Sequence, residues 1–103
     1  MKISFGDMSA EAAVAKINSN LAGRQLGEIV SLQLVKNQLQ VVVSKFGTSS
    51  FSFTCENLGQ GCTFELNGEK IAFAHRAFKN EVIEKLAGVV KTSGGELIAP
   101  YKG

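Results

Sequence analysis

The chain has 103 residues, a length typical of one domain with a single core. Hydrophobic residues make up 45% of it and charged residues 19%, which excludes a disordered chain and a coiled coil. The net charge is only +2 and the charged residues are spread along the sequence, so neither a nucleic-acid partner nor a membrane partner is predicted.

The first predicted element is an amphipathic helix that begins after Ser9, a suitable N-cap. Glu11 lies in the first turn, where the helix dipole favours an anion, and Gly23 is suited to the position just beyond the helix end. The apolar residues follow the spacing of a single helical stripe: Ala10, Ala13, Val14, Ile17 and Leu21. We expect this helix to lie on a sheet.

Five segments with alternating apolar and polar residues follow, which predicts strands. They cover residues 30–34, 39–44, 51–55, 62–66 and 71–73. Turns are expected at residues 37–38, 47–49, 57–60 and 67–68, and Asn67-Gly68 is the strongest hairpin signal in the chain. Because these turn lengths keep the apolar residues on one face, an antiparallel meander is predicted. Its expected register pairs Leu34 with Val41, Val43 with Phe53, Cys55 with Cys62 and Phe64 with Ile71.

A second helix is predicted to begin between residues 76 and 80 and to end at Lys91. Its apolar stripe consists of Phe78, Val82, Leu86 and Val89, flanked by Ile83 and Val90. Glu81 and Lys85 form a favourable i, i+4 pair. The fold class predicted for residues 1–95 is therefore a single two-layer α+β domain with an N-terminal helix, a five-stranded antiparallel meander and a C-terminal helix. Residues 96–103 form a tail that is either an edge strand or disordered.

Cys55 and Cys62 are candidates for a cross-strand disulfide, although two buried thiols are the favoured interpretation. Directly opposed Cβ atoms are about 4.5–5.5 Å apart, whereas a relaxed disulfide needs about 3.8 Å, so such a bond would be strained. These two cysteines and His75, the only histidine, cannot supply the four ligands of a structural zinc site. No metal and no cofactor are expected.

His75 is the residue best suited to general-base chemistry, but no catalytic motif surrounds it. We expect it to be a polar residue in the connection between the last strand and the second helix. The sequence accordingly favours a protein that is not an enzyme.

The polar face of the predicted sheet carries short, mostly uncharged side chains. Such a face suits contact with another surface, a second copy or a partner sheet, as well as plain exposure to water. The candidate partner residues are Ser31, Gln33, Gln40, Ser44, Ser52, Thr54 and Thr63.

The phenylalanines favour an ordinary core, but a strongly curled sheet would leave an apolar pocket against the second helix. The candidate pocket residues are Phe51, Phe53, Phe64, Phe73 and Phe78, and Phe46 could also line the pocket.

The order of a helix, a short antiparallel meander and a second helix resembles that of the small proteins encoded with polyhydroxyalkanoate granule genes. The stretches from Met8 through Leu21 and from Phe73 through Val90 carry this likeness. It lies in the pattern and not in a chemical motif, and the extra strand predicted here departs from it. The resemblance assigns no functional residue.

These observations predict a small non-enzymatic binding or interaction domain that pairs with a second copy or a protein partner through the sheet. The alternative is a carrier of a small apolar ligand. Residues 1–7 lack the apolar segment and cleavage site of a secretory signal, which favours a cytoplasmic location.

Overall fold

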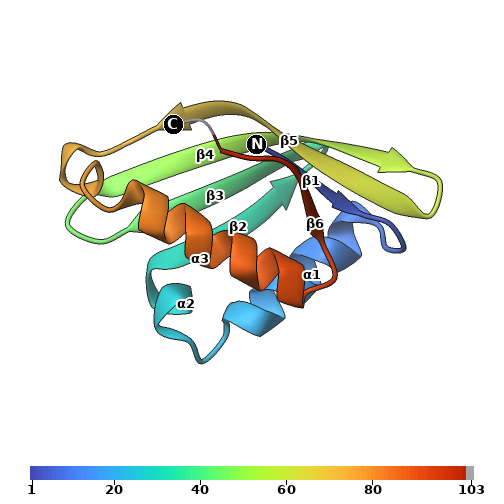
Figure 1. Ribbon diagram of the computed structural model, residues 1–103, viewed down its shortest axis with the longest axis horizontal. Helices are drawn as coiled ribbons and strands as arrows, with labels where there is room; N and C mark the ends of the chain where they lie inside the picture. The colour runs from blue at the N-terminus through green and yellow to red at the C-terminus, as the bar shows by residue number, and fades with distance from the viewer. Residues whose placement is uncertain (102–103) are drawn as a thin grey trace.

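The computed structural model describes residues 1–101, which form two layers: a six-stranded antiparallel sheet and helices that cover one of its faces (Figure 1). The strands are β1 (Lys2–Phe5), β2 (Val30–Val35), β3 (Gln38–Ser44), β4 (Thr48–Leu58), β5 (Gly61–Lys70) and β6 (Glu96–Ala99). The helices are α1 (Ala10–Leu21), α2 (Gln25–Ile29) and α3 (Lys79–Thr92), with a 3₁₀ turn, η1 (Phe73–His75). The predicted α+β class is confirmed. Within residues 1–101, no helix is both long and apolar enough to cross a membrane.

Helix α1 is built as the sequence predicts. The Ser9 side chain accepts a hydrogen bond from the Ala12 amide at 3.2 Å, and the Ala10 amide donates to Asn57 Oδ1 at 3.2 Å. These contacts satisfy N–H groups that the first turn of a helix leaves unpaired. The five residues of the predicted stripe are all buried, so burial of this stripe orients α1 on the sheet.

The sheet has one strand that the sequence pattern did not reveal. Strand β1 lies between β5 and β6 in the order β2-β3-β4-β5-β1-β6. Ile3 pairs with Phe64 and Phe5 pairs with Cys62, and both β1 side chains are buried. Four alternating residues are too few for a local strand signal, and their partners lie far along the chain. Of the two alternatives for the tail, the edge strand is the one observed: Glu96–Ala99 form β6 at the edge of the sheet. Residues 102–103 of the tail lie outside the described part of the chain.

The meander from β2 to β5 is confirmed, but the predicted registers are wrong. Leu34 pairs with Leu39 instead of Val41, and Cys55 pairs with Phe64 instead of Cys62. Both errors are shifts of two residues, because the tight turns lie at residues 36–37 and 59–60. The third error is a shift of four residues, since Val43 pairs with Ser49 instead of Phe53. A shift by an even number keeps every side chain on its face, so the core face is still correct.

The hairpin predicted at Asn67-Gly68 does not form. Strand β5 continues through both residues to Lys70, and the register with β4 shifts between Ser52 and Phe53, as at a β-bulge. Residues 71–73 do not form a strand in the sheet, and Phe64 pairs with Ile3 of β1 instead of Ile71. The physical reason is that β1 occupies the edge of β5 that a returning hairpin strand would use.

Helix α3 buries the predicted stripe, and Phe78 at its N-terminus is half-buried. The Glu81–Lys85 ion pair is present at 3.2 Å. At the other end of α3, the buried Ser93 hydroxyl donates to the Val89 carbonyl at 2.8 Å and accepts from Asn20 of α1 at 2.8 Å. This contact joins the two long helices above the core.

Two glycines offer a matched test of this packing. A methyl group at Gly95 would lie 2.6 Å from Val90 Cγ1 and 2.7 Å from the Phe5 ring, whereas one at Gly88, within α3, would meet nothing within 4 Å. We expect Gly95→Ala to lower the free energy of unfolding by about 1–3 kcal/mol through overpacking. Gly88→Ala should raise it by about 0.5–1 kcal/mol through helix propensity. Urea denaturation measures both, and equal effects of the two substitutions would contradict this packing.

Candidate functional site

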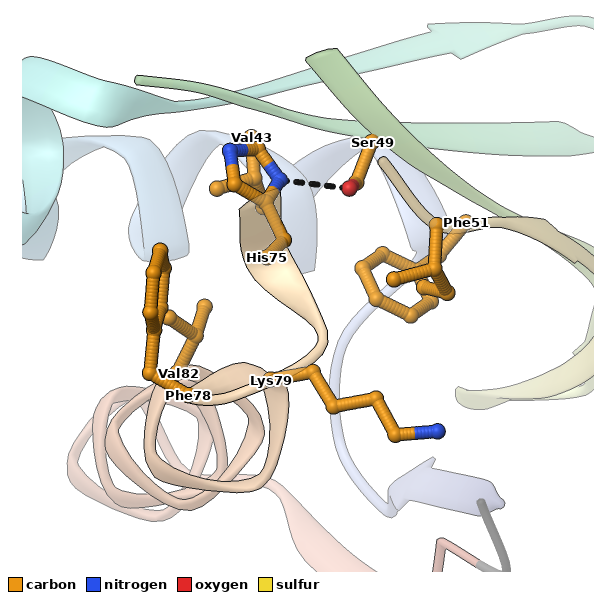
Figure 2. Close-up of a pocket in the computed structure, with 8 residues that line it drawn as sticks. Val43, Ser49, Phe51, His75, Phe78, Lys79 and Val82 are labelled. Carbon is orange, nitrogen blue, oxygen red and sulfur yellow. Dashed lines mark hydrogen bonds between the residues drawn. The ribbon is translucent and has the colours of Figure 1, made fainter. Parts of the chain in front are cut away.

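A buried pair of hydrogen-bonded side chains, Ser49 and His75, joins two loops at one end of the sheet. Ser49 lies in β4 just after the β3–β4 loop, and His75 ends η1; each is 2% exposed. Ser49 Oγ lies 2.5 Å from His75 Nδ1 (Figure 2). On the other side of the ring, His75 Nε2 lies 2.5 Å from the Lys45 carbonyl oxygen. The Ala72 amide donates to Ser49 Oγ at 2.8 Å. We call this network the Ser49–His75 clamp.

The Lys45 carbonyl determines the role of one ring nitrogen. A carbonyl oxygen can only accept, so His75 Nε2 donates to it. The Ser49 hydroxyl can donate to Nδ1 or accept from it, and in both cases each ring nitrogen has a hydrogen-bond partner, as burial requires. Because Ser49 and His75 are both buried, a substrate cannot reach the serine hydroxyl unless η1 moves. The Ser49–His75 clamp therefore holds the β3–β4 loop against η1.

The sequence contained a signal for Ser49 that the turn prediction at residues 47–49 obscured. Ser49 precedes Phe51 and Phe53 with the period of two that marks the core face of β4. A serine at such a position needs a buried hydrogen-bond partner. His75 was expected to be a polar connection residue, and it lies in that connection but is buried.

The pocket predicted between the sheet and the C-terminal helix is almost filled. The cavity lined by Phe51, His75 and Phe78 has a volume of about 10 Å³, room for a water molecule at most (Figure 2). Phe53 and Phe64 are buried in the core. The placement of Phe73 in this pocket is wrong, because its side chain is 85% exposed in η1. Phe46 is likewise 84% exposed.

A larger hollow lies elsewhere, between α2, the β3–β4 loop and α3, with a volume of about 540 Å³. Its charged side chains include Lys45, Glu81 and Lys85. Its apolar lining consists of Leu26, Ile29, Phe46, Phe78 and Val82. We call this hollow the α2–α3 groove.

Both cysteines are buried free thiols. The observed register makes them diagonal neighbours, since Cys55 pairs with Phe64 and Cys62 pairs with Asn57. Such neighbours have Cα atoms about 7–8 Å apart, beyond the usual span of a disulfide. Burial raises the pKa of the Cys62 thiol to about 11, and the nearby Cys55 and Glu11 add to this shift. The thiols are therefore protonated and weakly nucleophilic at neutral pH.

All seven predicted partner residues lie on strands β2 to β5 and alternate with the residues that face the core. Among the described residues 1–101, no helix covers this side of the sheet (Figure 1). In one row across the face, Gln33 pairs with Gln40 and Gln40 pairs with Ser52. The Gln40 and Ser52 side chains hydrogen-bond to each other at 2.9 Å. We call this side the outer face.

The chain shows no match to protein-family models, to curated proteins or to solved structures. The resemblance in element order to the proteins encoded with polyhydroxyalkanoate granule genes gains no support from these comparisons. The fold presents three candidate surfaces: the outer face, the α2–α3 groove, and the end of the sheet held by the Ser49–His75 clamp.

Removing the serine hydroxyl tests the clamp. Ser49→Ala leaves His75 Nδ1 without a hydrogen-bond partner and the Ala72 amide without an acceptor, at a cost of about 1–3 kcal/mol for each group. Ser50→Ala is the matched control, because its side chain lies on the other side of the same strand and is half-exposed. We expect that control to change the free energy of unfolding by less than about 0.5 kcal/mol. Similar urea midpoints for the two variants would contradict a stabilising clamp.

The Cys62 thiol makes stability depend on alkaline pH. Its pKa is about 11 in the folded protein against an ordinary value of 9.0, so the folded state favours the protonated thiol. This contribution is fully present below pH 9.0 and is lost as pH rises through about 11. The free energy of unfolding, measured between pH 9.0 and about 11, should fall less steeply for Cys62→Ala than for the unmodified protein. Parallel curves would show that the thiol does not titrate as described.

Proposed function

We propose that this protein is a non-enzymatic interaction domain that pairs with a second copy through its outer face. The observation that carries the proposal is the composition of that uncovered side. Strands β3 and β4 present serine, threonine, glutamine and valine to the solvent side, with no charged residue between Gln38 and Ser44 or between Thr48 and Cys55. A face exposed only to water usually carries more lysine and glutamate.

The chemistry of the outer face suits contact with a copy of itself. Hydroxyl and amide side chains such as Ser52 and Gln40 both donate and accept hydrogen bonds, so the same patch can face itself across a two-fold axis. Short side chains also let two sheets approach closely and lose little conformational entropy when they are ordered. Charged residues also lie on this side, on β5 and the far half of β4: Glu65 pairs with Thr54 and lies 4.0 Å from Lys2, and Glu56 pairs with Thr63. The uncharged area is therefore the part of this side formed by β2, β3 and the first half of β4.

The buried, protonated thiols of Cys55 and Cys62 support a location in a reducing compartment such as the cytoplasm, where free cysteines persist.

A carrier of a small apolar ligand remains the second candidate, and the α2–α3 groove favours it. Its volume of about 540 Å³ is within the range of small-molecule sites. Helix α2 has no buried residue, and Leu26 and Ile29 are only half-buried where they line this groove. The carrier proposal therefore moves from the filled cavity beside Phe51 to this groove.

A charged side chain at Ser52, in the uncharged part of the outer face, separates these candidates. Ser52→Arg should convert a dimer to a monomer without loss of fold, because two guanidinium groups would face each other across the axis. Ser19→Arg, on the exposed side of α1, is the control and should leave the dimer unchanged. Native mass spectrometry reports the subunit count and any retained ligand. A monomeric unmodified protein, or a dimer that survives Ser52→Arg, would contradict pairing through this face, and copurified apolar mass would favour the carrier.

A further inference from the structure

The two loops joined by the Ser49–His75 clamp concentrate positive charge. Residues 45–49 and 70–79 contain four of the chain's 11 basic residues, Lys45, Lys70, Arg76 and Lys79, and none of its 9 acidic residues. The rest of the chain has seven basic and nine acidic residues, a net charge of −2. The molecule therefore has one basic end, although its total charge is small.

Two acidic residues flank these segments in the sequence and have partners of their own, and a third, Glu28, lines the same hollow as Lys45 and Phe46. Glu69 accepts a hydrogen bond from the Tyr101 hydroxyl at 2.5 Å, and Glu81 forms an ion pair with Lys85 at 3.2 Å. Neither carboxylate forms an ion pair with Lys45 or Arg76 within the described residues 1–101. Both cations are thus available to a partner.

The same end carries the two most exposed phenylalanines. Phe46 in the β3–β4 loop is 84% exposed and Phe73 in η1 is 85% exposed. Each ring has a cation beside it: Lys45 Nζ is 5.9 Å from the Phe46 centroid, and the Arg76 guanidinium carbon is 5.6 Å from that of Phe73. Both loops lie at the left end of Figure 1, beyond the strands. We call this region the basic aromatic end.

We propose that the basic aromatic end docks on a membrane surface rich in anionic lipids, with Phe46 and Phe73 inserted at the headgroup boundary. This inference is independent of pairing through the outer face. It also departs from the sequence-based expectation of no membrane partner, which considered the net charge and the spread of charged residues along the sequence. Apolar rings that enter the acyl region and basic residues that remain with the lipid phosphates are the two attractions that hold a protein on such a surface.

The structure holds both rings ready for insertion. Phe46 has a backbone φ of +56°, a conformation that non-glycine residues seldom adopt. It is kept there by its neighbours, since the Lys45 amide donates to the Gly47 carbonyl at 2.9 Å and the Lys45 carbonyl accepts from His75. Because the clamp joins the loops of Phe46 and Phe73, insertion orders little chain, and the entropy cost of docking is low.

A lipid surface fits this end better than a folded or a nucleic-acid partner does. The rings lie on two separate loops and are almost wholly exposed, so a protein partner would have to provide two matched pockets, whereas lipid chains adapt to any shape. A nucleic acid would bind by stacking bases on the ring faces. One face of each ring is already occupied by Lys45 or Arg76.

Fluorescence gives a direct test, because the chain contains no tryptophan. Phe73→Trp places a single reporter in η1. Its emission should shift to the blue on addition of vesicles of equal parts phosphatidylserine and phosphatidylcholine, and should not shift with phosphatidylcholine alone. Leu58→Trp is the control, since Leu58 is 54% exposed at the opposite end of β4 and should remain in water.

Sedimentation with the same vesicles measures each contribution. Phe46→Asn, which suits the positive φ, and Phe73→Ser should each lower the partition coefficient by about tenfold or more, because burial of a phenyl ring exceeds the free energy of a tenfold change. Lys45→Glu with Arg76→Glu should abolish binding. The control is Lys16→Glu with Lys36→Glu, which changes the net charge by the same amount but at positions away from this end. It should reduce binding far less.

Two outcomes would overturn the proposal. The first is that the unmodified protein does not sediment with anionic vesicles at low salt. The second is that the Phe73→Trp emission shifts with an oligothymidylate strand or a polyglutamate peptide but not with vesicles, which would assign the end to a nucleic acid or an acidic protein.

Discussion

Strand β1 pairs with the edge of β5, and much of the rest of the molecule follows from this pairing. Residues 69–73 would otherwise be free to fold back on β5 at Asn67-Gly68, where the local sequence strongly favours a hairpin. With that edge occupied, β5 continues to Lys70 and the chain leaves the sheet as η1. The pairing with β1 also buries Ile3 and Phe5 against the core. A long-range contact therefore outweighs the strongest turn signal in the chain.

The departure of η1 from the sheet creates the basic aromatic end of the molecule. It brings His75 under the β3–β4 loop, where Ser49 and the Lys45 carbonyl satisfy both ring nitrogens. It also leaves Phe73 in solvent beside Arg76. A residue that would have been part of the core in a returning strand becomes an exposed ring on a basic loop. The buried clamp and the exposed aromatic surface are thus two results of the same change in chain path.

The two proposed surfaces differ in chemistry because they lie on different parts of the sheet. The outer face is wide and is uncharged over β2, β3 and the first half of β4, where its side chains can face copies of themselves. The basic aromatic end is narrow, positively charged and carries apolar rings. Because the helices cover only one side of the sheet, both surfaces are exposed at the same time (Figure 1). Self-association through one therefore leaves the other free.

The sequence by itself determined what local periodicity controls. The α1 stripe from Ala10 to Leu21, the core face of β3 and β4 and the buried side of α3 could all be predicted, because burial depends on the period of apolar residues and survives a register shift of two. The seven residues of the outer face were found by the same rule. Only the tertiary structure decided which strand borders β5, where Phe46 and Phe73 point, and that Lys45 and Arg76 meet at one end. These features depend on contacts between segments distant in sequence, which compete with local preference and leave no periodic signal.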